Sequence, residues 1–148
     1  MNTTIKQLAA DDLNEFSQML RLFGEVFEMT DFKMPAKKHL KKLLHSKNFI
    51  AFIAIDDNVV VGGITAHILP SYYSESSEVY IYDLAVKTNF RRKGIGKNLL
   101  LALTAYCREN NYKAFFVQAD EADSHALEFY SATGGLPEKV VHFNYLVE

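Results

Sequence analysis

The sequence predicts an α/β (α+β) fold in which a mixed β-sheet carries helices on both faces. Three observations lead to this prediction. Apolar residues recur at helical spacing in two N-terminal segments, three β-rich runs follow one another, and the C-terminal third alternates helical and extended segments. A sheet with helices on its faces accommodates this order of elements. With 148 residues and no linker, repeat or low-complexity segment, the chain is expected to form a single domain, residues 1–148.

The N-terminal part predicts a short strand followed by two amphipathic helices. The strand is expected over Thr4–Leu8, and Asp11 or Asp12 suits the N-cap of the next element. A first helix is expected over 12–27 because its apolar residues share one face: Leu13, Phe16, Leu20, Phe23 and Phe27. After Pro35, a second helix over 36–46 places leucines on one face and lysines on the other.

The middle of the chain predicts three consecutive strands, over 49–55, 59–69 and 78–86. Asp57 and Asn58 form a hairpin signal between the first two. The C-terminal third then predicts, in order, a helix over 94–108, a strand over 113–119, a helix ending near residue 133 and a closing strand over 139–147.

Composition narrows the classes of function. The formal net charge of -2 is spread along the chain, which gives no reason to expect a nucleic-acid partner. The N-terminus lacks the pattern of a signal peptide, and no apolar run approaches the roughly 20 residues that span a bilayer. The single cysteine, Cys107, cannot form an internal disulfide. A cytoplasmic protein with no membrane role is expected.

The most informative segment is the basic, glycine-containing turn Arg91-Arg92-Lys93-Gly94-Ile95-Gly96-Lys97 at the start of a helix. A helix N-terminus presents free N–H groups and partial positive charge, and glycine allows close approach of a phosphate. We interpret the turn as a pyrophosphate cradle, with a solvated basic loop as the alternative. Gly96 is followed by Lys97-Asn98, which excludes a P-loop, and Leu99 stands where a dinucleotide-binding turn needs its third glycine.

The turn fits the pattern R-x-x-G-x-G, with YDLAV before it and a helix, a strand and a tyrosine-bearing helix after it. This arrangement resembles the GNAT superfamily of acetyl-CoA-dependent N-acetyltransferases over nearly the whole chain. The resemblance implies that the turn, with Arg91, Arg92, Gly94, Ile95, Gly96 and Lys97, holds the CoA pyrophosphate. It also implies that Leu84 and Val86 of the preceding strand pair with the pantetheine arm.

Within the superfamily, the chain is most similar to the gentamicin-type aminoglycoside 3-N-acetyltransferases. The segments SSEVYIYDLAV and FVQAD carry this finer resemblance. It implies that Tyr130, in ALEFY, faces the CoA sulfur and supplies a proton to the departing thiolate. The alternative for Tyr130 is a core aromatic residue on an amphipathic helix.

Two further roles, an oxyanion donor and a base, complete the expected chemistry. The backbone N–H of Leu84 is the expected oxyanion donor, and Glu78 or Asp83 is the expected base. Asp83 has a buried structural role as its alternative, whereas Glu78 is either solvated or attracts the substrate. Because a carboxylate of ordinary pKa is a weak base for an ammonium group, desolvation or a water relay would have to assist.

The acidic segment QADEAD offers groups for a cationic substrate. Asp120 and Glu121 are assigned mainly to substrate binding, and Asp123 mainly to capping the helix that follows. Many members of the superfamily have asparagine where Asp123 appears, so a contact from this position to pantetheine is in doubt. The five histidines show no metal-ligand spacing with one another or with Cys107, so no metal is expected.

The sequence therefore predicts an acetyltransferase that moves acetyl from acetyl-CoA directly to the 3-amino group of an aminoglycoside in a ternary complex. One alternative is the same reaction on a polyamine, a small metabolite amine or a protein amine. Another is a catalytically silent acyl-CoA-binding module. By analogy with related enzymes, a homodimer is possible.

Overall fold

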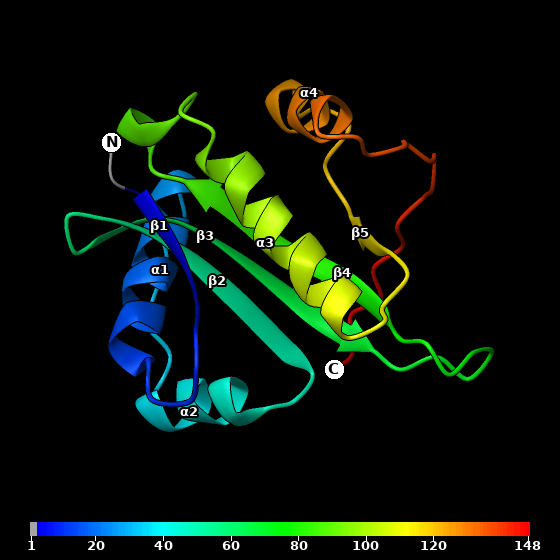
Figure 1. The fold of residues 1–148 in the computed structure, drawn as a ribbon, viewed down its shortest axis with the longest axis horizontal. Coiled ribbons are helices and arrows are strands. Elements are labelled where there is room, and N and C mark those ends of the chain that lie inside the picture. Colours follow the sequence, from blue (N-terminus) through cyan, green and yellow to red (C-terminus); the bar gives the residue numbers. More distant parts are fainter. Residues whose placement is uncertain (1–2) are drawn as a thin grey trace. The chain divides into compact units, whose positions relative to one another are not determined.

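The computed structural model describes residues 3–148, and within them the chain forms a five-stranded mixed sheet and four α-helices (Figure 1). The elements are β1 (Thr3–Gln7), α1 (Leu13–Val26), α2 (Lys37–His45), β2 (Phe49–Asp56), β3 (Val59–Leu69), β4 (Glu78–Val86), a 3-10 turn (Thr88–Phe90), α3 (Ile95–Glu109), β5 (Phe115–Val117) and α4 (Ser124–Ala132). Strand order in the sheet follows the sequence. The first four strands are antiparallel neighbours, and β5 runs parallel to β4. The predicted mixed α/β architecture is confirmed.

The chain divides into two compact units, which are described separately. The first unit, residues 1–118, contains the whole sheet with α1, α2 and α3. The second unit, residues 119–148, contains α4 and the C-terminal segment.

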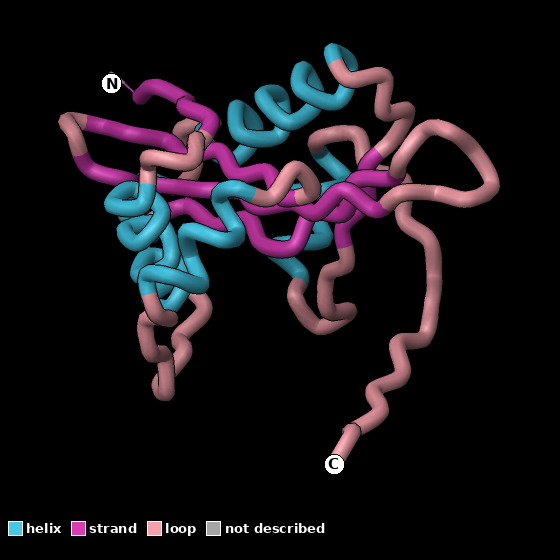
Figure 2. Tube along the Cα trace, turned by 90° about the horizontal axis from the view of Figure 1, so that it is seen from below, coloured by secondary structure: helices cyan, strands magenta, loops and turns pink. Residues whose placement is uncertain are grey.

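Helices cover both faces of the sheet in the first unit (Figure 2). Two adjacent glycines of β3 identify the helix on each face, because neighbouring residues of a strand face opposite sides of the sheet. A Cβ on Gly62 would meet Ile95 and Leu99 of α3, whereas one on Gly63 would overlap Met19 of α1. Consequently, α3 lies on one face and α1 on the other.

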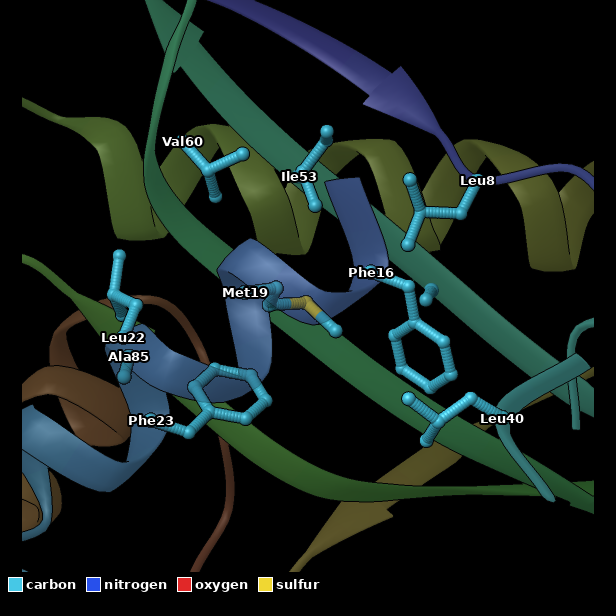
Figure 3. Close-up of a cluster of buried hydrophobic side chains, with 10 residues drawn as sticks. Leu8, Phe16, Met19, Leu22, Phe23, Leu40, Ile53, Val60 and Ala85 are labelled. Carbon is cyan, nitrogen blue, oxygen red and sulfur yellow. The ribbon is translucent and has the colours of Figure 1, made fainter. Parts of the chain in front are cut away.

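The face beneath α1 holds a continuous hydrophobic core (Figure 3). Phe16 and Met19 are almost completely buried, and Leu40 of α2 closes one side of the cluster. The remaining buried members come from α1, the sheet and the segment after β1: Leu8, Leu22, Phe23, Ala51, Ile53, Val60 and Ala85. This packing fixes the positions of β3 and β4, on which the candidate site is built.

Most predicted elements are confirmed, and β3 and β4 have the predicted bounds. The predicted strand over 113–119 is shorter, and only Phe115–Val117 pairs with β4.

The predicted closing strand over 139–147 is wrong. Within the second unit, residues 136–148 make no backbone hydrogen bond to another described backbone group, and most of their large apolar side chains are exposed. A strand needs a neighbouring strand for its N–H and C=O groups, and the described part of this unit contains none. The β-rich composition of this segment, which led to the prediction, does not by itself produce a strand.

Candidate functional site

The basic turn forms an open N-terminus for α3. Gly94 is the N-cap residue and has φ 80°, in the left-handed region that glycine adopts without strain. Arg92 also has a positive φ, 62°. A Cβ built on Gly94 would meet no heavy atom within 4 Å, so the backbone here borders open space. A ligand can therefore approach the main chain closely at this position.

The first N–H groups of α3 are free to bind such a ligand. The amide of Asn98 makes the first bond of the helix, to the carbonyl of Gly94 at 3.0 Å. Among the described residues, no carbonyl or capping side chain accepts from the N–H groups of Ile95, Gly96 and Lys97. Because α3 is 15 residues long, these donors carry the positive end of a substantial helix dipole.

The basic side chains of the turn differ in their contacts. The Nε of Arg91 donates to the carbonyl of Val86 at 3.5 Å, which ties the turn to the end of β4. The Nζ of Lys93 lies 5.1 Å from the centre of the Phe90 ring. Arg92 and Lys97 are exposed. Free N–H groups, an open glycine backbone and this positive charge together fit a pyrophosphate.

β4 presents an unpaired edge next to this cradle. It pairs with β5 only from Val79 to Ile81, opposite Phe115–Val117. From Tyr82 to Val86, the described residues provide no partner strand on that side. The open edge therefore leads along β4 toward the turn.

The N–H groups of Leu84 and Val86 point to the open edge. The amide of Asp83 donates to Thr65 Oγ1 at 3.2 Å, and that of Lys87 donates to the carbonyl of Val61 at 2.8 Å, so both face β3. Backbone N–H directions alternate along a strand. Leu84 and Val86, the two residues singled out from the sequence, thus offer donors to an extended ligand beside β4.

A β-bulge interrupts β4 at the same place. Thr65 of β3 lies opposite Asp83, but the next residue, Ala66, lies opposite Ile81, which leaves Tyr82 as the extra residue. Bulges re-aim side chains and often occur next to active sites. Thr65 is buried, and its hydroxyl holds the Asp83 amide within this irregular backbone. Sequence reasoning missed Thr65 because a threonine within a strand has no pattern that distinguishes it.

Asp83 is the carboxylate best suited to act as a base. Its side chain is half-buried on the face covered by α1, and no described group donates a hydrogen bond or forms an ion pair with it. Desolvation by burial raises the pKa of Asp83 from 3.8 to about 6. A carboxylate with this pKa accepts a proton from an amine more readily than an exposed one and is still ionised at pH 7.

Glu78, the other candidate base, lies at the first residue of β4 and is exposed. It is five positions before Asp83, a span of roughly 16 Å at about 3.3 Å per residue. A single reacting amine cannot contact both carboxylates directly at this separation. Of the two, Asp83 is the one beside the open edge.

The acidic segment lies in the second unit. Asp123 Oδ1 accepts from the Ala126 amide at 3.1 Å, so the predicted capping role of Asp123 is confirmed. Asp120 Oδ1 accepts from the Ala122 amide at 3.0 Å in the turn before α4, and Glu121 is exposed. Substrate binding by Asp120 and Glu121 stays a prediction.

Tyr130 lies near the end of α4 and is half-buried. Its ring contacts that of Phe129, with centroids 5.3 Å apart, and its carbonyl accepts from the Gly135 amide at 2.8 Å. Tyr130 and the acidic residues belong to one unit, whereas the cradle, the open edge and Asp83 belong to the other.

A cavity of about 430 Å³ lies at the opposite end of α3 from the cradle, between the last turns of the helix and the start of β5. Cys107 lines it, and burial raises the pKa of this thiol, which makes it a poor nucleophile.

Among residues 3–148 there is no group of three or more potential His, Cys, Asp or Glu metal ligands. No helix in the same range is long and apolar enough to cross a membrane.

The first unit thus places an open, positively charged helix N-terminus next to an unpaired strand edge and a carboxylate of raised pKa, an arrangement suited to an extended, phosphate-bearing ligand. The profile of the Acetyltransferase (GNAT) family matches residues 13–134. The chain belongs to the GNAT acetyltransferase family. Members of this family use acetyl-CoA.

Comparison with solved structures gives a finer picture. The chain is 46% identical to the aminoglycoside acetyltransferase meta-AAC0020 from an uncultured soil metagenomic sample, crystallised with sisomicin, with a TM-score of 0.96 over 99% of this chain and 97% of that one. It is 35% identical to the aminoglycoside acetyltransferase HMB0005, also from a soil metagenomic sample, with a TM-score of 0.94 and complete coverage of both chains.

More distant structures share the fold. The aminoglycoside acetyltransferase AAC(6')-Iy, solved with a CoA bisubstrate analogue, is 19% identical and has a TM-score of 0.81 over 99% of this chain and 100% of that one. At this identity the likeness shows the fold alone. Among curated proteins, the search finds no match.

Proposed function

We propose that this acetyltransferase transfers acetyl from acetyl-CoA to the 3-amino group of an aminoglycoside, by direct attack within a ternary complex. The observation that carries the substrate class is the 46% identity, over 99% of the chain, to an aminoglycoside acetyltransferase crystallised with sisomicin. The choice of the 3-amino group depends on the resemblance of SSEVYIYDLAV and FVQAD to the gentamicin-type enzymes.

Features of the first unit support the cofactor side of this proposal. The N–H groups of Ile95, Gly96 and Lys97, with the cations of Arg92 and Lys97, would hold the pyrophosphate of CoA. The N–H groups of Leu84 and Val86 would bind the pantetheine arm and the thioester oxygen along the open edge of β4. Acetyl-CoA supplies the thioester that the amine attacks.

Asp83 is the proposed base. As the amine nitrogen forms its bond to the acetyl carbon and the carbon–sulfur bond breaks, Asp83 takes the proton that nitrogen releases, directly or through a water. Burial has raised its pKa to about 6, so the carboxylate is both ionised and basic near neutral pH. Glu78 would bind a second ammonium group of the substrate.

Tyr130 is proposed to donate its phenolic proton to the departing sulfur. We expect Tyr130→Phe to lower kcat severalfold while the KM for acetyl-CoA stays within about twofold, because the phenol would act in the transition state. Tyr145→Phe, which changes an exposed tyrosine of the same unit, is the control. Undiminished turnover of Tyr130→Phe would remove this residue from the mechanism.

The test of the proposed function is CoA release from acetyl-CoA with gentamicin, sisomicin, spermidine, a lysine peptide and no amine. Release with the aminoglycosides, followed by mass spectrometry and NMR location of the acetyl group at the 3-amino nitrogen, supports the proposal. Acetylation at another nitrogen would refute the regiochemistry alone. Release only with spermidine or the peptide would refute the substrate, and acetyl-CoA binding without any release would favour a silent binding module.

A further inference from the structure

A row of aromatic rings crosses the sheet on the face that carries Asp83. The centroids of Phe49 and His67 are 5.4 Å apart, and those of His67 and Tyr82 are 5.6 Å apart. The ring centroids of Tyr82 and Tyr80 are 6.1 Å apart. Tyr80 then stacks on Phe116 of β5, with centroids 4.8 Å apart and planes inclined by 17°. We call Tyr80, Tyr82 and Phe116 the aromatic platform.

The strand register places this platform on the α1 face. Tyr80 lies opposite His67 of β3, which is an even number of residues from Gly63, the residue beneath Met19. Tyr82 is the bulged residue, and its ring meets the rings of both His67 and Tyr80 on this face.

The platform faces solvent, although α1 and α2 cover other parts of the same face. Tyr82 is 63% exposed and Phe116 is 39% exposed. Cross-strand aromatic pairs do stabilise sheets. A side chain as exposed as Tyr82, however, contributes little burial to the core, so the stability of the sheet does not account for a large ring at the bulge.

Carboxylates stand at both ends of the platform. Along β4, the order is Glu78, Tyr80, Tyr82 and Asp83, and the platform itself contains no cationic side chain. Aromatic faces carry negative electrostatic potential and attract C–H groups and ammonium groups, and the two carboxylates attract ammonium groups further. The chemical complement of this surface is a saccharide ring that bears several amines.

We propose that the aromatic platform is the acceptor-binding surface, on which one ring of a cationic aminosugar stacks against Tyr82 while Asp83 and Glu78 bind amines on either side. This inference rests on the proposed function and names the residues that recognise the sugar. A linear polyamine matches the carboxylates but has no ring to stack. The platform therefore distinguishes the two classes of acceptor.

The experiment compares Tyr82→Leu, which removes the aromatic face, with Tyr82→Phe, which keeps it. We expect Tyr82→Leu to raise the KM for sisomicin about 5- to 10-fold, the size of one lost aromatic contact. Tyr82→Phe should stay near the wild-type value, and the KM for acetyl-CoA should not change in either variant. The matched control is Tyr73→Leu, which alters a tyrosine that is 89% exposed and outside the platform.

Calorimetric binding of sisomicin and of spermidine to the same proteins separates this inference from the proposed function. Loss of sisomicin affinity in Tyr82→Leu, with spermidine affinity unchanged, supports the platform whether or not the sugar is acetylated. Turnover of sisomicin with equal KM in all variants would overturn the platform and leave the proposed function standing. Equal losses for Tyr82→Phe and Tyr82→Leu, or equal losses for both amines, would also overturn it. Absence of both sisomicin binding and turnover in the wild type would overturn both proposals.

Discussion

The two units of the chain differ in how they hold their functional groups. In the first, Met19, Ile53 and Leu99 are completely buried, and the cradle and Asp83 are attached to elements fixed by that core. In the second, α4 has no buried residue, and Leu136, Tyr145 and Val147 are more than four-fifths exposed. A site on packed strands and a helix terminus is preorganised by its scaffold, whereas the groups of the second unit depend on local capping and turns.

Because the two units hold their functional groups differently, we expect them to have different roles, and substitutions can test each role separately. Cofactor binding and proton removal are expected to depend on residues of the first unit, so substitutions there should change kinetics strongly. In the second unit, Tyr130→Phe should lower kcat and loss of the Asp123 cap should lower local helix stability, and both changes should leave cofactor binding intact.

The largest effect is expected for Asp83→Asn. Removal of a general base costs about 10²–10⁴-fold in rate, so we expect kcat to fall at least about 100-fold at pH 7. In the wild type, kcat/KM should rise with pH as the Asp83 carboxyl loses its proton around pH 6, and this limb should be absent from the variant. Glu75→Gln, which changes an exposed carboxylate of the same unit, should retain full activity.

The same Asp83→Asn substitution that lowers activity should stabilise the folded protein at pH 7. Because the folded-state pKa of Asp83 is raised, the folded protein binds its proton more tightly than the unfolded chain, and this group lowers stability as pH rises from about 4 to about 6. At pH 7, we expect the free energy of unfolding of Asp83→Asn to exceed that of the wild type by about 1–3 kcal/mol, which raises its denaturant midpoint. This difference should disappear at pH 4. A variant that is both inactive and less stable at pH 7 would indicate a structural role for this carboxylate.

The next effect tests the cradle with a matched pair of glycines. Gly94 and Gly134 both have positive φ, 80° and 100°, and a Cβ on either would meet nothing within 4 Å. Valine is strained by about 1–3 kcal/mol in such a conformation. Gly94→Val should raise the KM for acetyl-CoA roughly tenfold, because the backbone must move where the pyrophosphate binds, whereas Gly134→Val should leave it unchanged. Equal KM values in both variants would show that the turn is not the cofactor site.

The features that the sequence could predict are those with a local signal, whereas features decided by strand pairing could not be predicted. Elements with a strong local apolar pattern were predicted closely: the bounds of β4 and of β3, which is buried almost continuously on both faces, are as expected. The open, basic N-terminus of α3 was predictable because its signal, positive charge and glycine at a helix start, is local. The bulge at Tyr82 was not, since it arises from the pairing register with β3. The strand predicted over 139–147 failed for the same reason, because pairing is decided by a partner that a local pattern does not reveal.

A smaller effect is expected from the packing of the first unit. A methyl group on Gly63 would overlap the side chain of Met19, which is completely buried. We expect Gly63→Ala to destabilise the protein by about 1–3 kcal/mol in urea unfolding. Adding Met19→Ala should make the double variant less unstable than the sum of the two single variants, since the overlap disappears. If the changes in the free energy of unfolding are strictly additive, a side chain at position 63 does not clash with Met19.

The smallest effect is expected in the second unit, for the cap of α4. Asp123 accepts from the Ala126 amide, and loss of such a cap costs about 1 kcal/mol. Asp123→Ala should accelerate hydrogen exchange at the first amides of α4, whereas Asp123→Ser, which can still accept, should restore protection. The KM for acetyl-CoA should be the same in both variants, because the carboxylate acts on the helix and not on pantetheine. A KM that rises in Asp123→Ala and is not restored by serine would make Asp123 a ligand contact.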